Sequence, residues 1–144
     1  MMRLQSVSPR DWGLLILRLG LGITLLAHGY PKFFEGGPGA FARYLTRIHF
    51  PAPQLSAWFM AIVEFLGGLA LIAGFQTTYA GYLAALERLL IAWRLKMAVG
   101  VKFIAARGVG WEFDFLIFCM AIAVALLGAG AVTAEAFWRS RRTM

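Results

Sequence analysis

The chain has 144 residues, of which 60% are hydrophobic, 15% aromatic and only 15% charged. This balance, with a mean hydropathy of +0.71, excludes an ordinary small soluble domain and indicates an integral membrane protein. The formal net charge is +7, but the excess cations lie beside apolar stretches. We therefore expect them to meet the anionic headgroups of a lipid bilayer, and we expect no nucleic-acid partner.

Four apolar stretches follow one another along the chain, each long enough to cross a hydrocarbon core about 30 Å thick as a helix. Their number places both termini on one side of the membrane, and the connections leave no room for a separate soluble domain. We expect an all-α integral membrane protein, a bundle of four transmembrane helices forming one domain over residues 1–144. The predicted spans are 12–30, 56–75, 79–99 and 113–132.

The first stretch, 12–30, follows Arg3 and Arg10 and could be confused with a secretory signal peptide. Arg18, however, interrupts its apolar part, and no small-x-small cleavage site follows His28. Both features favour a first transmembrane helix over a cleaved leader.

A short amphipathic segment, 39–49, connects the first two spans. Phe41, Leu45 and Ile48 are spaced by four and three residues, which puts them on one face of a helix. Arginines lie elsewhere on the helix, so the pattern predicts a short helix in the membrane interface. The two prolines that follow end this helix and turn the chain back toward the membrane.

Glu64 lies at the midpoint of the second stretch, 56–75, which is otherwise uncharged. A charged side chain at the centre of a spanning helix costs roughly 2.5 to 3.5 kcal/mol on insertion scales, so Glu64 should be paired, protonated or in contact with a watery cavity. A lone carboxyl at this depth indicates a functional site. Gly67 and Gly68, which follow it, predict close packing against another helix.

The third stretch, 79–99, carries four charges, so we expect the other helices to enclose it. Glu87 and Arg94 are seven residues apart and share a helix face, whereas Arg88 points about 100° away from Glu87. These charges therefore need partners on different helices. Arg18 of the first span is expected to snorkel to the membrane surface or to reach Glu87. We interpret Arg18, Glu87 and Arg88 as structural polar residues that fix helix register.

The fourth stretch, 113–132, is apolar after Asp114, and two aromatic residues beyond it, Phe137 and Trp138, suit an interfacial anchor. A cluster of arginines in the last residues of the chain favours cytoplasmic termini. Cys119 is the only cysteine in the chain, so an internal disulfide is excluded.

Alternating spans would bring five polar side chains to one half of the membrane, in a funnel suited to a ligand with an apolar tail and a polar head. Glu64 and His28 are the candidate catalytic residues, for proton transfer, and Arg94, Glu112 and Lys32 are the candidate ligand-binding residues. Other interpretations stay open: His28 could cap a helix, Lys32 could snorkel to the interface, and Glu112 could simply begin a helix. The sequence has no metal-ligand spacing of histidine or cysteine.

Five short motifs occur in order along the chain, namely RLGLG after Leu17, HG at His28 with Lys32, PAP after Phe50, VEFLGGLALIAG from Val63 and GWEFDFL from Gly110. In this order they resemble the DoxX family of small four-helix bacterial membrane proteins, over about residues 14–130. The resemblance implies a multi-pass protein of the bacterial inner membrane. The family is named after a subunit associated with a thiosulfate:quinone oxidoreductase.

The same resemblance places five residues at the family's characteristic polar positions: Arg18, His28, Lys32, Glu64 and Glu112. The third stretch departs from the family, which usually shows there an apolar stretch leading into a Val-His pair. Glu87-Arg88 and Arg94-Leu95-Lys96 stand in that stretch instead. A substrate shared with the family therefore does not follow from the resemblance.

Two functions are compatible with these features. In the first, the chain is a subunit of a membrane oxidoreductase system, in which a lipid quinone enters the funnel, His28 or Arg94 donates to a carbonyl oxygen, and Glu64 transfers the proton. The chain has no cofactor motif of its own, so a redox partner protein would supply electrons. In the second, it is a non-enzymatic assembly or binding factor with a structural polar core. Whether it is an enzyme stays open, and a homo-oligomer is among the partners considered.

Overall fold

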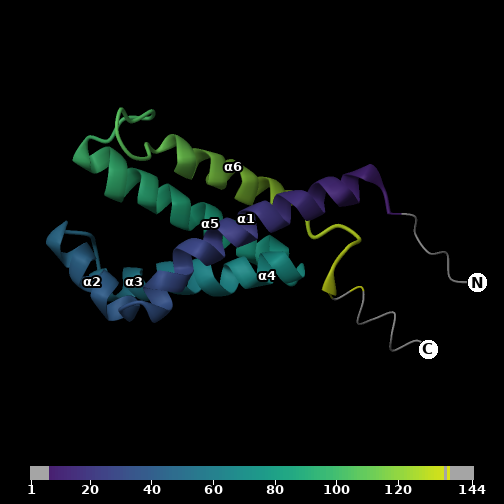
Figure 1. Ribbon diagram of the computed structural model, residues 1–144, viewed down its shortest axis with the longest axis horizontal. Helices are drawn as coiled ribbons and strands as arrows, with labels where there is room; N and C mark the ends of the chain where they lie inside the picture. The colour runs from purple at the N-terminus through teal and green to yellow at the C-terminus, as the bar shows by residue number, and fades with distance from the viewer. Residues whose placement is uncertain (1–6, 135, 137–144) are drawn as a thin grey trace, which may run out of the picture.

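The computed structural model describes residues 7–134 and 136, and within them the chain is helical with no strand. The all-α class predicted from the sequence is thereby confirmed (Figure 1). The elements are α1 (Pro9–Phe34), α2 (Gly37–Arg47), α3 (Pro53–Ile62), η1 (Val63–Gly67), α4 (Gly68–Ala73), α5 (Thr77–Leu90), η2 (Ile91–Lys96), η3 (Met97–Val99) and α6 (Glu112–Leu127).

Helix α1 is longer than the predicted span, because its first turn is capped. The Ser8 hydroxyl accepts a hydrogen bond from the Asp11 backbone N–H, and the Asp11 carboxylate accepts one from the Ser8 backbone in return. Pro9 occupies the first helical position, where its missing N–H costs nothing. Two glycines with positive φ, Gly36 and Gly37, then allow the sharp turn into α2.

Two continuous helices contain a π-helical turn. The π turn η1 joins α3 to α4, and η2 continues α5. In the described part of the chain, Pro9–Phe34 and Pro53–Ala73 are the two helices long and apolar enough to cross a membrane. Helix α6 ends at Leu127, before the predicted limit of residue 132, because Gly128 leaves the helical conformation at φ 77°.

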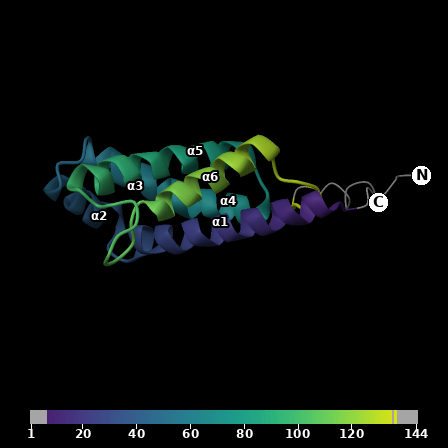
Figure 2. The same cartoon turned by 90° about the horizontal axis from the view of Figure 1, so that it is seen from above.

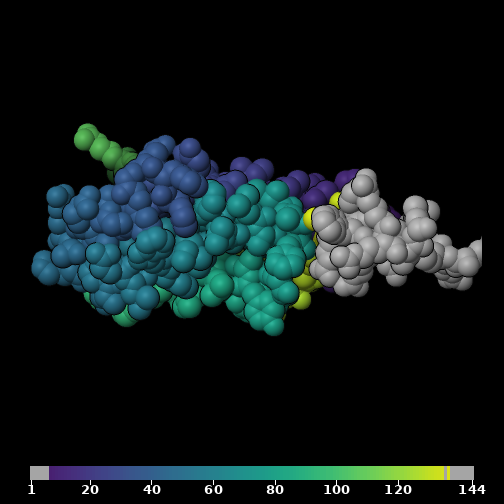
Figure 3. All heavy atoms as spheres, turned by 90° about the horizontal axis from the view of Figure 1, so that it is seen from below, coloured from purple at the N-terminus to yellow at the C-terminus, as the bar shows by residue number. Residues whose placement is uncertain are grey.

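The helices pack as a bundle in which α1 contacts η1, α4 and α6, while α5 lies alongside α6. Helix α2 and the 100–111 loop lie at one end of this bundle, and the start of α1 lies at the other (Figures 1 and 2). Helix α2 packs on α3, and the two form one continuous surface (Figure 3). Its inner face buries Ala42 and Leu45, whereas Arg43 and Arg47 are exposed.

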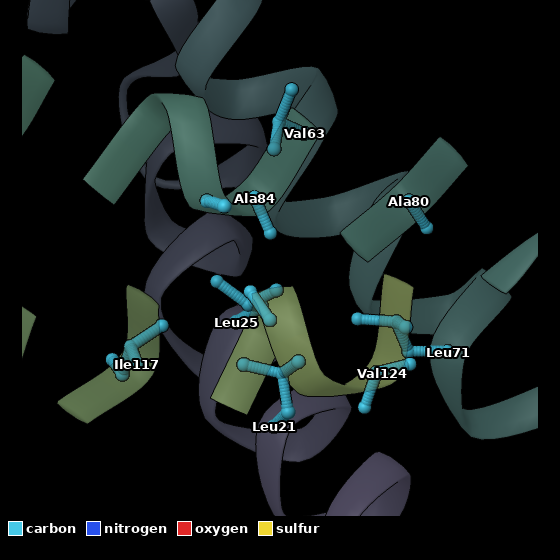
Figure 4. Packing of buried hydrophobic residues seen from close by; sticks show 10 residues of the cluster. Leu21, Leu25, Val63, Leu71, Ala80, Ala84, Ile117 and Val124 are labelled. Atoms are coloured by element: carbon cyan, nitrogen blue, oxygen red, sulfur yellow. The ribbon is translucent and has the colours of Figure 1, made fainter. Parts of the chain in front are cut away.

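The central core consists of leucines from α1 and α4 packed against small residues of α5 (Figure 4). Leu21, Leu25 and Leu71 are fully buried, and Ala84 faces them from α5. A Cβ on Gly81 would lie 2.7 Å from a carbonyl oxygen of α6. Small residues on α5 therefore let α6 approach closely, so the charged part of α5 is enclosed by its neighbours.

Helix α1 crosses the second long helix at a pair of glycines. A Cβ on Gly68 would lie 2.8 Å from the Gly22 carbonyl oxygen and 2.8 Å from the Leu26 backbone nitrogen. A Cβ added to the neighbouring Gly67 would have no atom within 4 Å. The two adjacent glycines therefore differ in what they do: Gly68 permits the crossing and Gly67 does not take part in it.

Gly68→Ala should destabilise the fold by about 1–3 kcal/mol, because the added methyl group collides with the backbone of α1. Gly67→Ala should change stability by no more than about 0.5 kcal/mol. Unfolding of both variants in mixed detergent micelles measures the difference. Equal destabilisation by the two substitutions would contradict the assignment of the crossing point.

Candidate functional site

Glu64 is fully buried, and the π turn η1 presents it to two cations from different helices. Its Oε2 lies 2.5 Å from Lys32 Nζ of α1, and its Oε1 contacts Arg88 Nη2 of α5. Lys32 is 20% exposed and lies 4.9 Å from the centroid of the Phe41 ring in α2. Lys32 therefore turns inward to a buried carboxylate, and the interpretation that it snorkels to the interface is wrong.

Arg88 is the centre of the buried charges. Its guanidinium donates to Glu87 twice, from Nε at 2.7 Å and from Nη2 at 2.9 Å, and it also contacts Glu64. Its Nη1 lies 3.6 Å from Asp114 Oδ1 of α6. One side chain of α5 therefore connects carboxylates of the second, third and fourth long helices. A planar guanidinium with five N–H donors suits such a position better than an ammonium group.

Lys96 completes the cluster on its far side. Its Nζ lies 2.7 Å from Asp114 Oδ2 and donates to the Gly110 carbonyl oxygen at 2.9 Å. Three cations and three carboxylates thus form one connected series, which we call the ion network. Its members are Lys32, Glu64, Glu87, Arg88, Asp114 and Lys96. The formal charges of the ion network sum to zero, which reduces the cost of burying them.

Arg94 does not join Glu64, contrary to the predicted funnel. It lies beside Trp93, with its guanidinium carbon 5.4 Å from the ring centroid, and it is half-buried. The spacing of seven from Glu87 assumed a regular helix, but the π turn η2 lies between the two residues. A π turn holds one more residue than an α turn and rotates everything after it, so Arg94 leaves the face of Glu87.

Two further residues of the predicted funnel lie outside the ion network. His28 is exposed on α1, and its ring centroid is 5.7 Å from that of Phe113. Glu112 begins α6, and its Oε2 is buried without a hydrogen-bond partner among the described residues. The structure therefore brings Glu64 and Lys32 into direct contact, whereas His28, Arg94 and Glu112 make no hydrogen bond or ion pair with either of them among the described residues.

The expected contact between Arg18 and Glu87 is also absent from the described residues. Arg18 is buried, and its Nη2 donates to the Val132 carbonyl oxygen at 2.7 Å, while Glu87 is bound by Arg88. Glu87 and Arg88 face inward together because both are held by one guanidinium–carboxylate contact. The prediction that Arg18 reaches Glu87 or snorkels to the surface is wrong.

Asp114 and Lys96 are the site residues to which sequence reasoning gave no role. Charge balance could have indicated them. Within the predicted spans the sequence has four cations, Arg18, Arg88, Arg94 and Lys96, which need as many acids, and Glu64 with Glu87 supplies only two. Asp114 is the next acid inside a predicted span. In the described part of the chain no group of three His, Cys, Asp or Glu residues could hold a metal ion.

A cavity of about 200 Å³ reaches the ion network from the side of α5 and α6. Its walls are almost entirely apolar and are dominated by aromatic rings, while Arg88 and Asp114 are the charged residues among the described ones that line it. The lining residues are Arg88, Leu89, Ala92, Trp93, Met97, Trp111, Asp114, Phe115 and Phe118. Such a cavity suits a flat, mainly apolar group that carries a hydrogen-bonding oxygen.

Comparison with known proteins identifies the family. The DoxX family model matches residues 13–97, which is more than half of the chain. The chain belongs to the DoxX family. A relative named "Putative oxidoreductase CatD", from Bacillus subtilis (strain 168), is 30% identical over 125 residues, which are 87% of this chain and 86% of the relative. No solved structure matches the chain of this DoxX protein.

The match confirms the resemblance seen in the sequence and, with the two apolar helices, supports a DoxX-like membrane protein. Five of the six members of the ion network lie within the matched residues, and Asp114 lies beyond them. The cavity is therefore formed partly by the family's matched segment and partly by α6.

Proposed function

We propose that this DoxX protein binds the headgroup of a lipid quinone and serves as a subunit of an oxidoreductase system in the bacterial inner membrane. The observation that carries the proposal is the aromatic cavity that ends on Arg88 and Asp114. A quinone ring is flat and apolar, with carbonyl oxygens that accept hydrogen bonds. The name of the Bacillus subtilis relative, "Putative oxidoreductase CatD", supports the same class of chemistry.

The proposal includes four membrane spans with both termini on the cytoplasmic side. Large apolar side chains such as Ile16, Ile23 and Leu116 are exposed on the outside of the bundle, as expected where lipid replaces water. Helix α5 with η2 and η3 is about 34 Å long at 1.5 Å per residue, which matches the hydrocarbon core. Three of its charges, on Glu87, Arg88 and Lys96, are compatible with the membrane because the ion network neutralises them.

Within the cavity, Arg88 is the hydrogen-bond donor to a quinone carbonyl oxygen, and Asp114 is the group that exchanges a proton with it. Arg88 keeps its proton throughout. Reduction of a quinone to a quinol consumes two electrons and two protons. A redox partner protein supplies the electrons, since this chain has no cofactor motif. Asp114 lines the cavity and is paired with Lys96, so these two groups are placed to deliver protons to the quinone oxygens.

Glu64 acts in this scheme by holding Arg88 rather than by reaching the quinone. Arg88 stands between Glu64 and Asp114, and a guanidinium that cannot lose its proton does not pass protons on. Glu64 is therefore a positioning residue, and His28, which packs against Phe113, is not among the residues that line the cavity.

A non-enzymatic assembly or binding factor is the second candidate, and the neutral ion network favours it. Three cations and three carboxylates satisfy one another without any ligand. Buried ion pairs can specify helix arrangement without taking part in chemistry. In this case polypeptide partners, and no quinone, would copurify with the protein.

Asp114→Asn should weaken binding of a short-chain ubiquinone at least tenfold, because it removes the carboxylate that lies beside Arg88 Nη1, the proposed donor, and leaves Lys96 without its charge partner. Quinones quench tryptophan fluorescence, and two of the five tryptophans line the cavity, so quenching in nanodiscs measures the affinity. Asp11→Asn is the matched control, because Asp11 lies in the first turn of α1 and does not line the cavity. Equal affinities for wild type and Asp114→Asn, or no quenching at all, would reject the quinone site.

A further inference from the structure

The quinone cavity, the cavity of about 200 Å³ that ends on Arg88 and Asp114, takes aromatic rings from two helices. Trp93 comes from η2, and three further rings come from the start of α6. Stacked or edge-on aromatic pairs attract one another beyond the burial of their surfaces. A ligand with a larger aromatic surface therefore gains more from these walls than a ligand with a single ring.

Two of these rings are held in place from outside the cavity. Phe103 of the 100–111 loop packs edge-on against Trp111, with 4.5 Å between the ring centroids, and against Phe115, with 6.1 Å. The loop is closed onto the start of α6, because the Phe103 carbonyl oxygen accepts a hydrogen bond from the Glu112 backbone N–H at 3.1 Å. This part of the wall is therefore ordered before a ligand binds, which reduces the entropic cost of stacking on it.

Hydrogen-bonding side chains meet the cavity at one place. Arg88 Nη1 and Asp114 Oδ1 lie 3.6 Å apart, and the rest of the described lining is almost entirely apolar. A ligand oxygen near this pair can be hydrogen-bonded. A ligand oxygen elsewhere in the cavity would lose its hydrogen bonds to water and gain none, which weakens binding. The lining therefore selects a ring with few oxygens.

The mouth of the cavity lies on the outside of the bundle. Trp93, Met97 and Phe115 line the cavity and are 57%, 49% and 46% exposed. With four membrane spans, this surface meets the acyl chains of the bilayer. A ring can therefore enter the cavity from the membrane while an apolar tail attached to it stays in the lipid.

We propose that the site selects a naphthoquinone with an apolar tail over a dimethoxybenzoquinone such as ubiquinone. The inference rests on the proposed function, because it names the class of quinone for the same cavity. Both classes present a carbonyl oxygen to Arg88. They differ in the rest of the ring: the naphthoquinone has a fused benzene ring, which the aromatic walls stack on, where ubiquinone has two methoxy oxygens, for which the described lining has no second donor.

The experiment compares two ligands with the same tail, menadione bearing a decyl chain and decylubiquinone. Quenching of tryptophan fluorescence in nanodiscs gives the affinity for each, expressed per concentration in the lipid because the two ligands partition differently. The wild type should bind the naphthoquinone at least about tenfold more tightly. This ratio decides the question without any variant, so it does not depend on whether a substituted chain folds.

Phe115→Leu tests whether the aromatic wall is the source of the preference. Phe115 is partly exposed, so its replacement by another apolar side chain leaves the core intact, and both lining tryptophans remain as reporters. The ratio of the two affinities should fall below about threefold, because the naphthoquinone loses stacking surface. A general distortion of the fold would weaken both ligands and leave the ratio unchanged. Phe34→Leu is the matched control, since Phe34 is also exposed but does not line the cavity, and it should keep the wild-type ratio.

The outcomes separate this inference from the function on which it rests. Equal affinities, or tighter binding of decylubiquinone, would overturn the naphthoquinone preference and leave the quinone site standing. A preference that Phe115→Leu and Phe34→Leu both retain in full would also overturn the inference, because the aromatic wall would not be its cause. Binding of neither ligand would reject the quinone site itself.

Discussion

Arg88→Met is expected to destabilise the protein by about 3–5 kcal/mol, because it removes the cation that three buried carboxylates share. Glu64, Glu87 and Asp114 all contact this one guanidinium. Its removal leaves two fully buried carboxylates on η1 and α5 with Lys32 as their remaining cation. The free energy of unfolding, measured in mixed micelles by circular dichroism, gives the size of the loss.

Arg94→Met is the matched control for this substitution. Arg94 is on the same continuous helix six residues later, is half-buried and has no ion pair among the residues that the structure describes. Its replacement should cost less than about 1 kcal/mol. If the two variants lost equal stability, Arg88 would not be the centre of the network, and the quinone cavity would lose its proposed donor.

The helical class and the importance of Glu64 could be predicted because both follow from local sequence. Apolar stretches of span length predict helices, and a single carboxyl in such a stretch needs a partner wherever the helix packs. The bounds of α1 and α6 differ from the prediction for equally local reasons, the cap at Ser8 and the positive φ of Gly128. Composition alone does not locate such ends.

The identity of the partners could not be predicted, because it depends on backbone geometry. The π turn η2 removes Arg94 from the face of Glu87, and the π turn η1 presents Glu64. No residue pattern in these segments indicates a π turn. The departure of Arg94 from the face of Glu87 is therefore decided by one extra residue per turn, which the regular period of 3.6 does not describe.

Glu64→Gln and Lys32→Met are expected to be strongly coupled. Glu64→Gln alone should cost about 3–5 kcal/mol, because Lys32 and Arg88 lose their shared carboxylate. Lys32→Met alone should cost about 1–3 kcal/mol. The double variant should lose less than the sum of the two by about 0.5–3 kcal/mol, since neither partner is then left unpaired. Unfolding free energies of the four proteins give the coupling directly.

Glu35→Gln is the control partner for Lys32→Met, because Glu35 is an exposed acid three residues away and makes no ion pair in the described part of the chain. These two substitutions should add within about 0.5 kcal/mol. If the stability losses of Glu64→Gln and Lys32→Met were additive, the contact between the two residues would be contradicted.

Ligand retention in the same variants separates the two proposed functions. If Glu64 positions Arg88 for a quinone, Glu64→Gln should retain less copurifying quinone than the wild type, as measured by mass spectrometry, because Arg88 then loses one of its anchors. The double variant should recover little of it, since Lys32 does not hold Arg88. If the polar core serves only assembly, polypeptide partners should copurify with the wild type and with the double variant alike, and no quinone should be found with either. The buried carboxyl is then structural.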